Sequence, residues 1–267
     1  MSAKHRPTFL ILLSLLPALT LSGLAFGQQT AKDLVTRGDA KAAKGDLDDA
    51  IADYSKAIEL DPNDGDTYYD RGNAKREKGD LDDAIADYSK AIELNPQYAS
   101  AYQNRGIAKK ARGNLDGAIA DYSKAVELNP KDADAYFSRG NAKRTKHDLD
   151  GAIADFSKAI ELSPQYADAY HNRGIAKWSK HDLDGAIADC TKAIELNPKH
   201  PNAYMTRGIA RKDKGYLDGA IADFSKFIEL NPQFAAAYTL RGDVKKDQGD
   251  QAGADADFAQ AAKIGGK

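Results

Sequence analysis

The chain has only one cysteine among its 267 residues, so no disulfide bond can form within it. It also lacks a basic excess, because 38 lysines and arginines stand against 40 aspartates and glutamates and leave a net charge of −2. A general nucleic-acid-binding protein normally carries such an excess. No serine–histidine–acid set, phosphate-binding loop or metal motif stands out. We therefore expect no enzymatic activity, no cofactor and no nucleic-acid partner.

Proline is scarce too, but its placement is regular. Six of the nine prolines recur every 34 residues, and seven glycines keep the same step. The prolines are Pro62, Pro96, Pro130, Pro164, Pro198 and Pro232. The glycines are Gly38, Gly72, Gly106, Gly140, Gly174, Gly208 and Gly242. A fixed period of this length indicates one helical hairpin repeated along a solenoid, whose stacked units share a continuous core.

Seven such units account for residues 31–267, with residues 28–30 as a short lead-in. The units are 31–64, 65–98, 99–132, 133–166, 167–200, 201–234 and 235–267. Thr30 precedes the first unit, and together with Asp33 it fits a capping box. We expect one elongated all-α domain rather than two globular ones.

The unit 65–98 reads as two helices. Its second half carries an apolar stripe with helical spacing, formed by Leu81, Ala84, Ile85, Tyr88, Ala91 and Ile92. Asp80 stands in front of this stripe as an N-cap, and Pro96 ends it, since proline cannot continue a helix. Gly79 marks the turn between the halves. Gly72, in the first half, predicts a close approach of two helix backbones.

This pattern resembles the tetratricopeptide repeat family. The resemblance covers residues 31–267 and rests on one set of positions with its equivalents in the other units: Gly72, Gly79, Ala84, Tyr88, Ala91 and Pro96. Pentatricopeptide and Sel1-like repeats have slightly longer periods and fit less well. The resemblance implies a right-handed superhelical solenoid of stacked antiparallel helical hairpins. It also implies that the first helix of each hairpin lines a concave groove.

Two charged series depart from the usual family pattern. An arginine precedes the first glycine of every unit, and an aspartate follows sixteen residues after that arginine. The arginines are Arg37, Arg71, Arg105, Arg139, Arg173, Arg207 and Arg241. The aspartates are Asp53, Asp87, Asp121, Asp155, Asp189, Asp223 and Asp257. We expect an ion-pair ladder that joins the two helices of a hairpin, or adjacent hairpins, in preference to a ligand-binding row of arginines.

A second series is basic where the family often has an aromatic residue: Lys41, Lys75, Lys109, Lys143, Lys177, Arg211 and Lys245. We expect these long stems to cover apolar surface while their charged ends reach water. Cys190 stands in a series of tyrosines and phenylalanines, which predicts a small buried residue rather than a reactive thiol. His147 and His181 replace a turn glycine and are expected to be exposed, with a weak surface metal site as the alternative.

The groove positions vary between units, in contrast to the framework. The predicted binding residues are Tyr69, Asn73, Arg76, Gln103, Asn104, Lys110, Phe137, Asn141, Arg144, His171, Asn172, Trp178, Met205 and Lys212. Amides can bond a peptide backbone at both donor and acceptor groups, bases would favour an acidic segment, and aromatic residues dominate interfaces. We expect a protein or peptide partner in this groove.

Other functions stay open at this point. Some family members hold a carboxylate tail with two asparagines and several bases; Asn73 and Asn104 match the amides, but Tyr69, Asp134 and Ser138 occupy positions where bases are needed. We therefore expect no such clamp. The alternative to groove binding is a structural protein that self-associates through its terminal repeats, and residues that merely drifted after duplication would also look like this groove.

The amino terminus differs from the repeats. Lys4 and Arg6 precede an apolar stretch over residues 9–26, and residues 1–27 contain no acidic residue. A basic start followed by an apolar run and small residues is typical of a secretory signal peptide, with cleavage expected after residue 27. The run has about the minimum length for crossing a bilayer and is interrupted by Pro17. We expect a periplasmic or extracellular protein, with an uncleaved membrane anchor as the alternative.

Overall fold

The computed structural model describes residues 29–266, which contain fourteen α-helices and no β-strand. The predicted signal peptide lies outside the described residues. The helices are α1 (Ala31–Ala42), α2 (Leu47–Leu60), α3 (Gly65–Lys78), α4 (Leu81–Leu94), α5 (Ala99–Ala111), α6 (Leu115–Leu128), α7 (Ala133–Thr145), α8 (Leu149–Leu162), α9 (Ala167–Ser179), α10 (Leu183–Leu196), α11 (Pro201–Asp213), α12 (Leu217–Leu230), α13 (Ala235–Asp247) and α14 (Gln251–Gly265).

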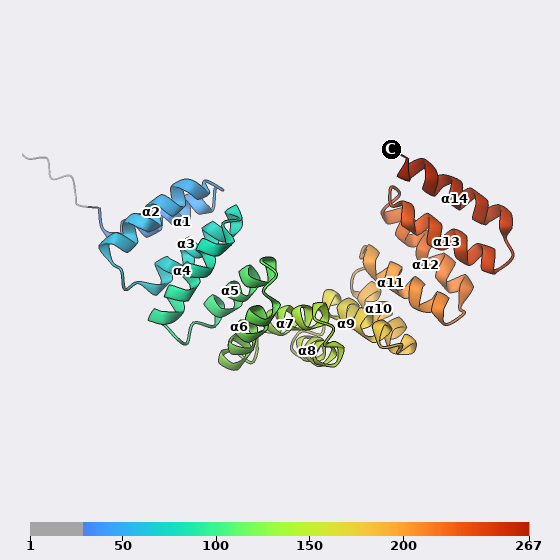
Figure 1. Ribbon diagram of the computed structural model, residues 1–267, viewed down its shortest axis with the longest axis horizontal. Helices are drawn as coiled ribbons and strands as arrows, with labels where there is room; N and C mark the ends of the chain where they lie inside the picture. Colours follow the sequence, from blue (N-terminus) through green and yellow to red (C-terminus); the bar gives the residue numbers. More distant parts are fainter. Residues whose placement is uncertain (1–28, 267) are drawn as a thin grey trace, which may run out of the picture.

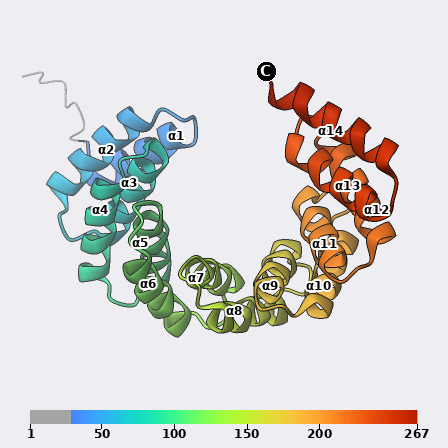
Figure 2. The same ribbon diagram turned by 45° about the vertical axis from the view of Figure 1, so that its right-hand side comes forward.

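The helices form seven antiparallel hairpins stacked into an arch (Figure 1). The odd-numbered helices lie on the inner side of the arch and the even-numbered helices on the outer side (Figure 2). Each helix packs against its hairpin partner and against the hairpin that follows. This confirms the predicted all-α, right-handed superhelical solenoid.

Local chemistry sets the helix ends. Thr30 accepts a hydrogen bond from the Asp33 backbone N–H, and the Asp33 carboxylate accepts one from the Thr30 N–H, so the predicted capping box forms. Asn95, before a proline, leaves the helical region with φ −134° and ψ 91°. Asp80 occupies the predicted N-cap position of α4, but its side chain makes no capping hydrogen bond.

The recurring glycines make room for an aromatic ring, which corrects the expectation of two closely packed backbones. A Cβ atom on Gly72 would lie 2.8 Å from Cε1 of Tyr88, a ring of the partner helix. The same ring contact recurs at Gly140 with Phe156. In the fifth unit the ring is absent, and Gly174 faces Cys190 instead. Cys190 is buried as predicted, and burial raises the pKa of its thiol to about 12.

The predicted ion-pair ladder is present, and it joins both the helices of a hairpin and neighbouring hairpins. Arg71 on α3 donates from Nε and Nη2 to the two carboxylate oxygens of Asp87 on α4, at 2.9 and 2.7 Å. Its Nη1 donates to Oγ of Ser55 on α2 of the preceding unit at 3.0 Å. The guanidinium also stacks over the ring of Tyr68. Equivalent Arg–Asp pairs occur in all seven units.

The second basic series has a different role from the one expected. Lys75 Nζ lies 2.8 Å from Asp87 Oδ2, so its charged end pairs with the buried ladder carboxylate instead of reaching water. The reason is helical phase, because Lys75 follows Arg71 by four residues and shares its face. Each ladder aspartate therefore has two cationic partners.

His147 and His181 are exposed turn residues, as predicted, and both adopt left-handed backbone conformations with φ of 61° and 63°. In the part of the chain that the structure describes, no three histidine, cysteine, aspartate or glutamate side chains gather closely enough to hold a metal ion. Within residues 29–266, no helix is both long and apolar enough to cross a membrane.

Candidate functional site

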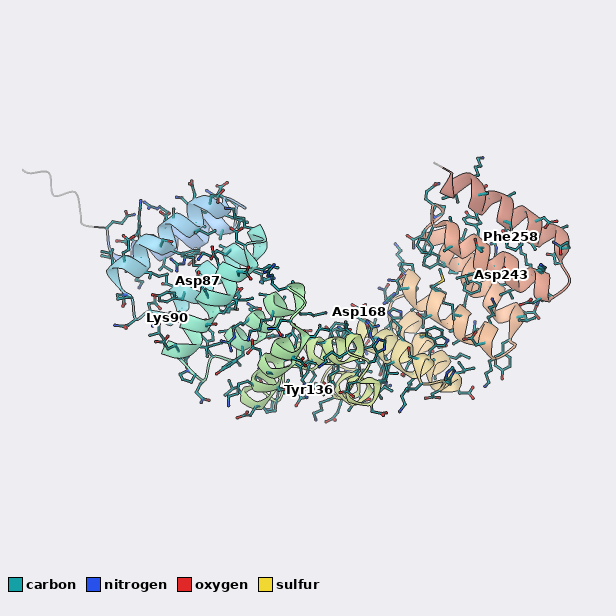
Figure 3. The ribbon with its side chains drawn as sticks, viewed as in Figure 1. Asp87, Lys90, Tyr136, Asp168, Asp243 and Phe258 are labelled. Carbon is teal, nitrogen blue, oxygen red and sulfur yellow. The ribbon has the colours of Figure 1, made fainter. Side chains whose placement is uncertain are left out.

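The predicted binding residues lie on α3, α5, α7, α9 and α11, on the inner side of the arch (Figure 2). Side chains from these helices project toward its open side (Figure 3). Twelve of the fourteen are half-buried; Lys110 is exposed and His171 is buried. We call this surface the concave groove.

Pairs of packed rings recur along the concave groove, two of them tilted and one edge to face. Each pair joins a residue of a first helix to the residue just before the first helix of the next unit. Ring centroids lie 4.9 Å apart for Tyr69 and Tyr98, and 4.9 Å apart for Phe137 and Tyr166. His171 and His200 occupy the same places with centroids 4.7 Å apart.

Polar ends fix some of these pairs to the first helix of the same unit. Tyr166 donates its hydroxyl proton to Asp134 at 2.7 Å. His200 accepts from the Ala203 N–H through Nδ1, so its Nε2 carries the proton donated to Asp168 at 3.0 Å. The second residue of each pair was missed from the sequence. A period-34 comparison of residues 98, 166, 200 and 234 would have revealed a ring at each.

The His171 side chain lies beneath the groove surface, inside the packing of α9. It is buried, and Nε2 lies 3.1 Å from the Thr206 hydroxyl. Burial, followed by the nearby His200, lowers the pKa of His171 to about 4. The imidazole is therefore neutral at physiological pH and is not exposed to a ligand.

The asparagines of the second and third units bond to each other. Asn104 donates from Nδ2 to Tyr69 Oη at 2.9 Å and to Asn73 Oδ1 at 2.8 Å. Tyr88 donates its hydroxyl proton to the same Asn73 oxygen at 2.9 Å. This network links α3 and α5. Because both amides take part in it, only some of their donors and acceptors remain available to a ligand.

The remaining amides are less constrained. Asn172 donates to the backbone oxygen of Asp168 within α9 at 2.9 Å. Gln103 and Asn141 are half-buried and form no side-chain hydrogen bond with the described residues. These two amides therefore have donors and acceptors available on the groove surface.

A row of cations occupies one repeated position of the inner helices: Arg76, Lys110, Arg144 and Lys212. None of the four forms an ion pair within residues 29–266, whereas the cations of the ladder are all paired. Arg144 is half-buried, and its Nε is buried without any hydrogen-bond partner. Burial lowers the pKa of Arg144. Partial desolvation and the nearby positive charge of Arg144 lower the pKa of Lys110.

Trp178 occupies the position of this row that belongs to the fifth unit. Its Nε1 donates to Asp213 Oδ2 on α11 at 2.7 Å, and the side chain is half-buried. Because this is the sole tryptophan in the chain, it is a natural optical reporter for the centre of the groove.

The opposite charge marks the amino-terminal end of the groove, another feature missed from the sequence. Asp39 on α1 accepts a hydrogen bond from the Tyr54 hydroxyl at 2.8 Å. Asp70 on α3 is half-buried, and burial together with the charge of Asp39 raises its pKa to about 6. The inner surface is thus acidic near Asp39 and Asp70 and becomes basic from Arg76 on α3 to Arg144 on α7.

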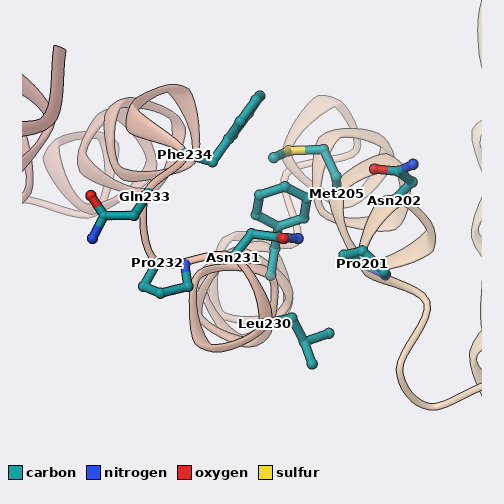
Figure 4. A pocket seen from close by; sticks show the side chains of 9 residues that line it. Pro201, Asn202, Met205, Leu230, Asn231, Pro232, Gln233 and Phe234 are labelled. Carbon is teal, nitrogen blue, oxygen red and sulfur yellow. The ribbon is translucent and has the colours of Figure 1, made fainter.

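An apolar pocket of about 640 Å³ opens beside Met205, between α11, α12 and the start of α13 (Figure 4). Its lining residues are Pro201, Asn202, Met205, Phe227, Leu230, Asn231, Pro232, Gln233 and Phe234. Met205 was among the predicted groove residues. Phe227 was not, although it alone interrupts an alanine series formed by Ala57, Ala91, Ala125, Ala159, Ala193 and Ala261.

Comparison with protein-family models gives matches along the repeats. A model described as "TPR repeat" matches residues 38–75, 72–111, 108–145 and 140–180. Models described as "Tetratricopeptide repeat" match residues 167–200 and 201–234. Among proteins with curated functions, none matches the chain significantly.

Many solved structures share the fold. A crystal structure of MamA protein is 32% identical, with a TM-score of 0.59, and the match covers 64% of this chain and 94% of that chain. YrrB, described as "a TPR protein with an unusual peptide-binding site", is 24% identical over 69% of this chain and 95% of its own, with a TM-score of 0.61. A tetratricopeptide repeat protein from Parabacteroides merdae is 23% identical over 89% of this chain and 94% of its own, with a TM-score of 0.69.

Proposed function

Because the chain belongs to the tetratricopeptide repeat family, we propose that it is an exported scaffold without enzymatic activity. Its ligand is an acidic segment of a partner protein, held in the concave groove. The observation that carries this proposal is the row of unpaired cations on the inner helices, above all Arg144 with its unpartnered Nε.

The cations of this row are unpaired within the described part of the chain, in contrast to those of the ion-pair ladder. A desolvated cation without a partner costs free energy, and the ladder avoids that cost by pairing its buried charges. A carboxylate placed between Arg144 and Lys110 would recover the lost interactions and reduce the repulsion between the two cations. Complementary charge of this kind raises the association rate and selects the partner.

Two further observations agree with the proposal. YrrB, a structural neighbour with the same fold, is described as having a peptide-binding site. Gln103 and Asn141 offer free amides beside the cation row, and such amides can bond an extended backbone. Export is proposed from the basic and apolar pattern of residues 1–27.

The experiment is affinity capture from the exported fraction with three forms of the protein: the native chain, a Lys110→Glu and Arg144→Glu double variant, and a control. The control, Lys44→Glu with Lys131→Glu, makes the same charge change at two exposed, unpaired lysines off the groove. We expect the native chain and the control to retain the same partner, and the groove variant to lose it while its circular dichroism stays unchanged. Equal recovery of the partner by all three forms would show that the partner does not bind in the concave groove.

Sedimentation of the native chain addresses the self-associating alternative. Leu60 and Tyr216 leave 59% and 53% of their surface exposed, the kind of apolar area that copies of the chain could share. A mass that rises with protein concentration, together with no captured partner, would favour the structural role.

A further inference from the structure

The pocket beside Met205 lies where the series of packed ring pairs changes its chemistry. At the equivalent places in the fourth and fifth units, Tyr166 and His200 pack on a ring of the first helix and hydrogen-bond to an aspartate of that helix. In the last such pair Phe234 has no polar atom, and residue 202 is asparagine in place of aspartate. The Phe234 side chain therefore forms no hydrogen bond to α11.

Phe234 packs against the ring of Phe227. The two phenylalanine rings meet edge to face with centroids 5.3 Å apart. Phe227 is buried at a position where six units have alanine, and α11 and α13 approach each other less closely than the other consecutive first helices. A space remains between Met205 and Phe234, which face each other across it (Figure 4). Phe234 keeps 49% of its surface exposed.

The lining of this pocket specifies the chemistry of its occupant. Its walls are side chains without charge, and its polar groups are three amides, Asn202, Asn231 and Gln233. A pocket of this size and lining takes an apolar side chain, with amides available for the flanking backbone. Carboxylates would find no cation in the lining.

The pocket and the cation row are parts of the same surface. Lys212 follows Met205 by seven residues on α11, which corresponds to roughly 10 Å along a helix. Lys212 is unpaired, like the other members of the cation row. An extended chain covers this distance in about three residues. One ligand segment can therefore place an apolar side chain in the pocket and a carboxylate on Lys212.

We propose that the pocket is the anchor site for one apolar side chain, phenylalanine or leucine, of the acidic segment, spaced about three residues from its first carboxylate. This inference rests on the proposed function and adds the identity and spacing of the anchor. Burying one such side chain strengthens binding by at least about tenfold.

The probes are two synthetic twelve-residue peptides with four aspartates. One has phenylalanine three residues from the nearest aspartate, and the other has alanine there. The chain supplies its own reporters: Met205 is the sole methionine among residues 29–266, and Trp178 is the sole tryptophan. We expect the phenylalanine peptide to bind at least tenfold more tightly, to shift the ¹³C-methyl resonance of Met205, and to change Trp178 fluorescence.

A matched pair of variants tests the pocket itself. Phe234→Ser removes a pocket wall, and Tyr216→Ser removes an aromatic side chain of similar exposure, 53% against 49%, outside the pocket. Both residues stand at N-cap positions, of α13 and α12 respectively, so the backbone context is alike. We expect only Phe234→Ser to abolish the preference for the phenylalanine peptide.

The outcomes separate this inference from the proposed function. Equal affinities of the two peptides, both changing Trp178 fluorescence and both lost with Lys110→Glu and Arg144→Glu, would overturn the anchor and leave the acidic groove intact. Binding of neither peptide would overturn the anchor, and the capture experiment would decide the groove. A Met205 resonance that shifts with protein concentration alone would assign the pocket to a second copy of the chain and overturn the proposal.

Discussion

Arg139 donates two parallel hydrogen bonds to Asp155, from Nε to Oδ2 at 2.9 Å and from Nη2 to Oδ1 at 2.7 Å. The aspartate side chain is 5% exposed, and Lys143 lies 2.8 Å from its second oxygen. Two cations thus depend on one buried carboxylate. Bidentate bonds between charged groups are among the stronger polar interactions in proteins.

Replacing that carboxylate is the first prediction. Asp155→Ala leaves Arg139 and Lys143 largely buried and unpaired, and we expect the free energy of unfolding to fall by about 3 kcal/mol. Urea unfolding followed by circular dichroism measures the change. Asp150→Ala is the control, since Asp150 is 82% exposed and pairs with Lys180 at the surface, where an ion pair contributes less than about 1 kcal/mol. Similar losses for both variants would contradict a stabilising role for the ladder.

The second prediction concerns the ring contact of Gly72. In Gly72→Ala the new methyl group would lie 2.8 Å from the ring of Tyr88, so the buried ring must shift, at a cost of about 1–3 kcal/mol. Gly65→Ala in the same helix is the control, because its Cβ would meet its nearest neighbour at an ordinary 3.5 Å. Thermal melting should show a lower Tm for the first variant only. A Tm unchanged by Gly72→Ala would mean that the ring is not tightly packed.

The third prediction uses the turn histidines. His147 has a φ of 61°, whereas five other units place glycine with φ between 80° and 95° at this turn. Left-handed backbone is costly for a residue with a Cβ, so we expect His147→Gly to raise the free energy of unfolding by about 1 kcal/mol. Lys146→Gly, one residue earlier in the chain at φ −83°, should lower it. Destabilisation by both changes, measured in urea, would argue for a contact of the imidazole.

The fourth prediction is a pH dependence caused by His171. Its pKa is about 4 in the folded chain, below the ordinary 6.5, so the unfolded chain binds more protons between these values. Its contribution to stability is constant above pH 6.5, falls as the pH decreases toward 4, and levels off below. The total loss is about 3 kcal/mol. Asp168, Arg144 and His200 are the charged or titratable groups around it.

His171→Phe should remove this dependence. The substitution copies the fourth unit, where Phe137 packs on a neighbouring ring at 4.9 Å much as His171 packs on His200 at 4.7 Å. Unfolding measured from pH 7 to pH 4 in both forms gives the comparison. Identical slopes for the two forms would assign the pH dependence to other groups.

Much of the fold followed from the sequence because its determinants repeat. The charges of Arg71 and Asp87 recur sixteen residues apart in every unit, so their pairing was predictable without coordinates. The part played by Lys75 was predicted wrongly, since the destination of a long flexible side chain depends on where the partner carboxylate is buried. The place of Gly72 against a ring, rather than a backbone, depends on packing that no period reveals.

The candidate site was less predictable for a related reason. The positions of Met205 and Trp178 on the inner helices followed from family resemblance and helical spacing. The pocket did not, because it results from one departure, Phe227, acting together with Phe234 at the end of the same unit. The unpartnered state of the Arg144 Nε likewise emerges only when every nearby acceptor has a position.

The side chain of Arg71 reaches Asp87 sixteen residues ahead and Ser55 sixteen residues behind. Since the same donors and acceptors recur every 34 residues, deleting one internal unit creates a new junction at which the arginine again meets an equivalent aspartate and an equivalent hydroxyl residue. Duplicating a unit does the same. The length of the solenoid is therefore free to change by whole units while the arginine contact across each junction is kept.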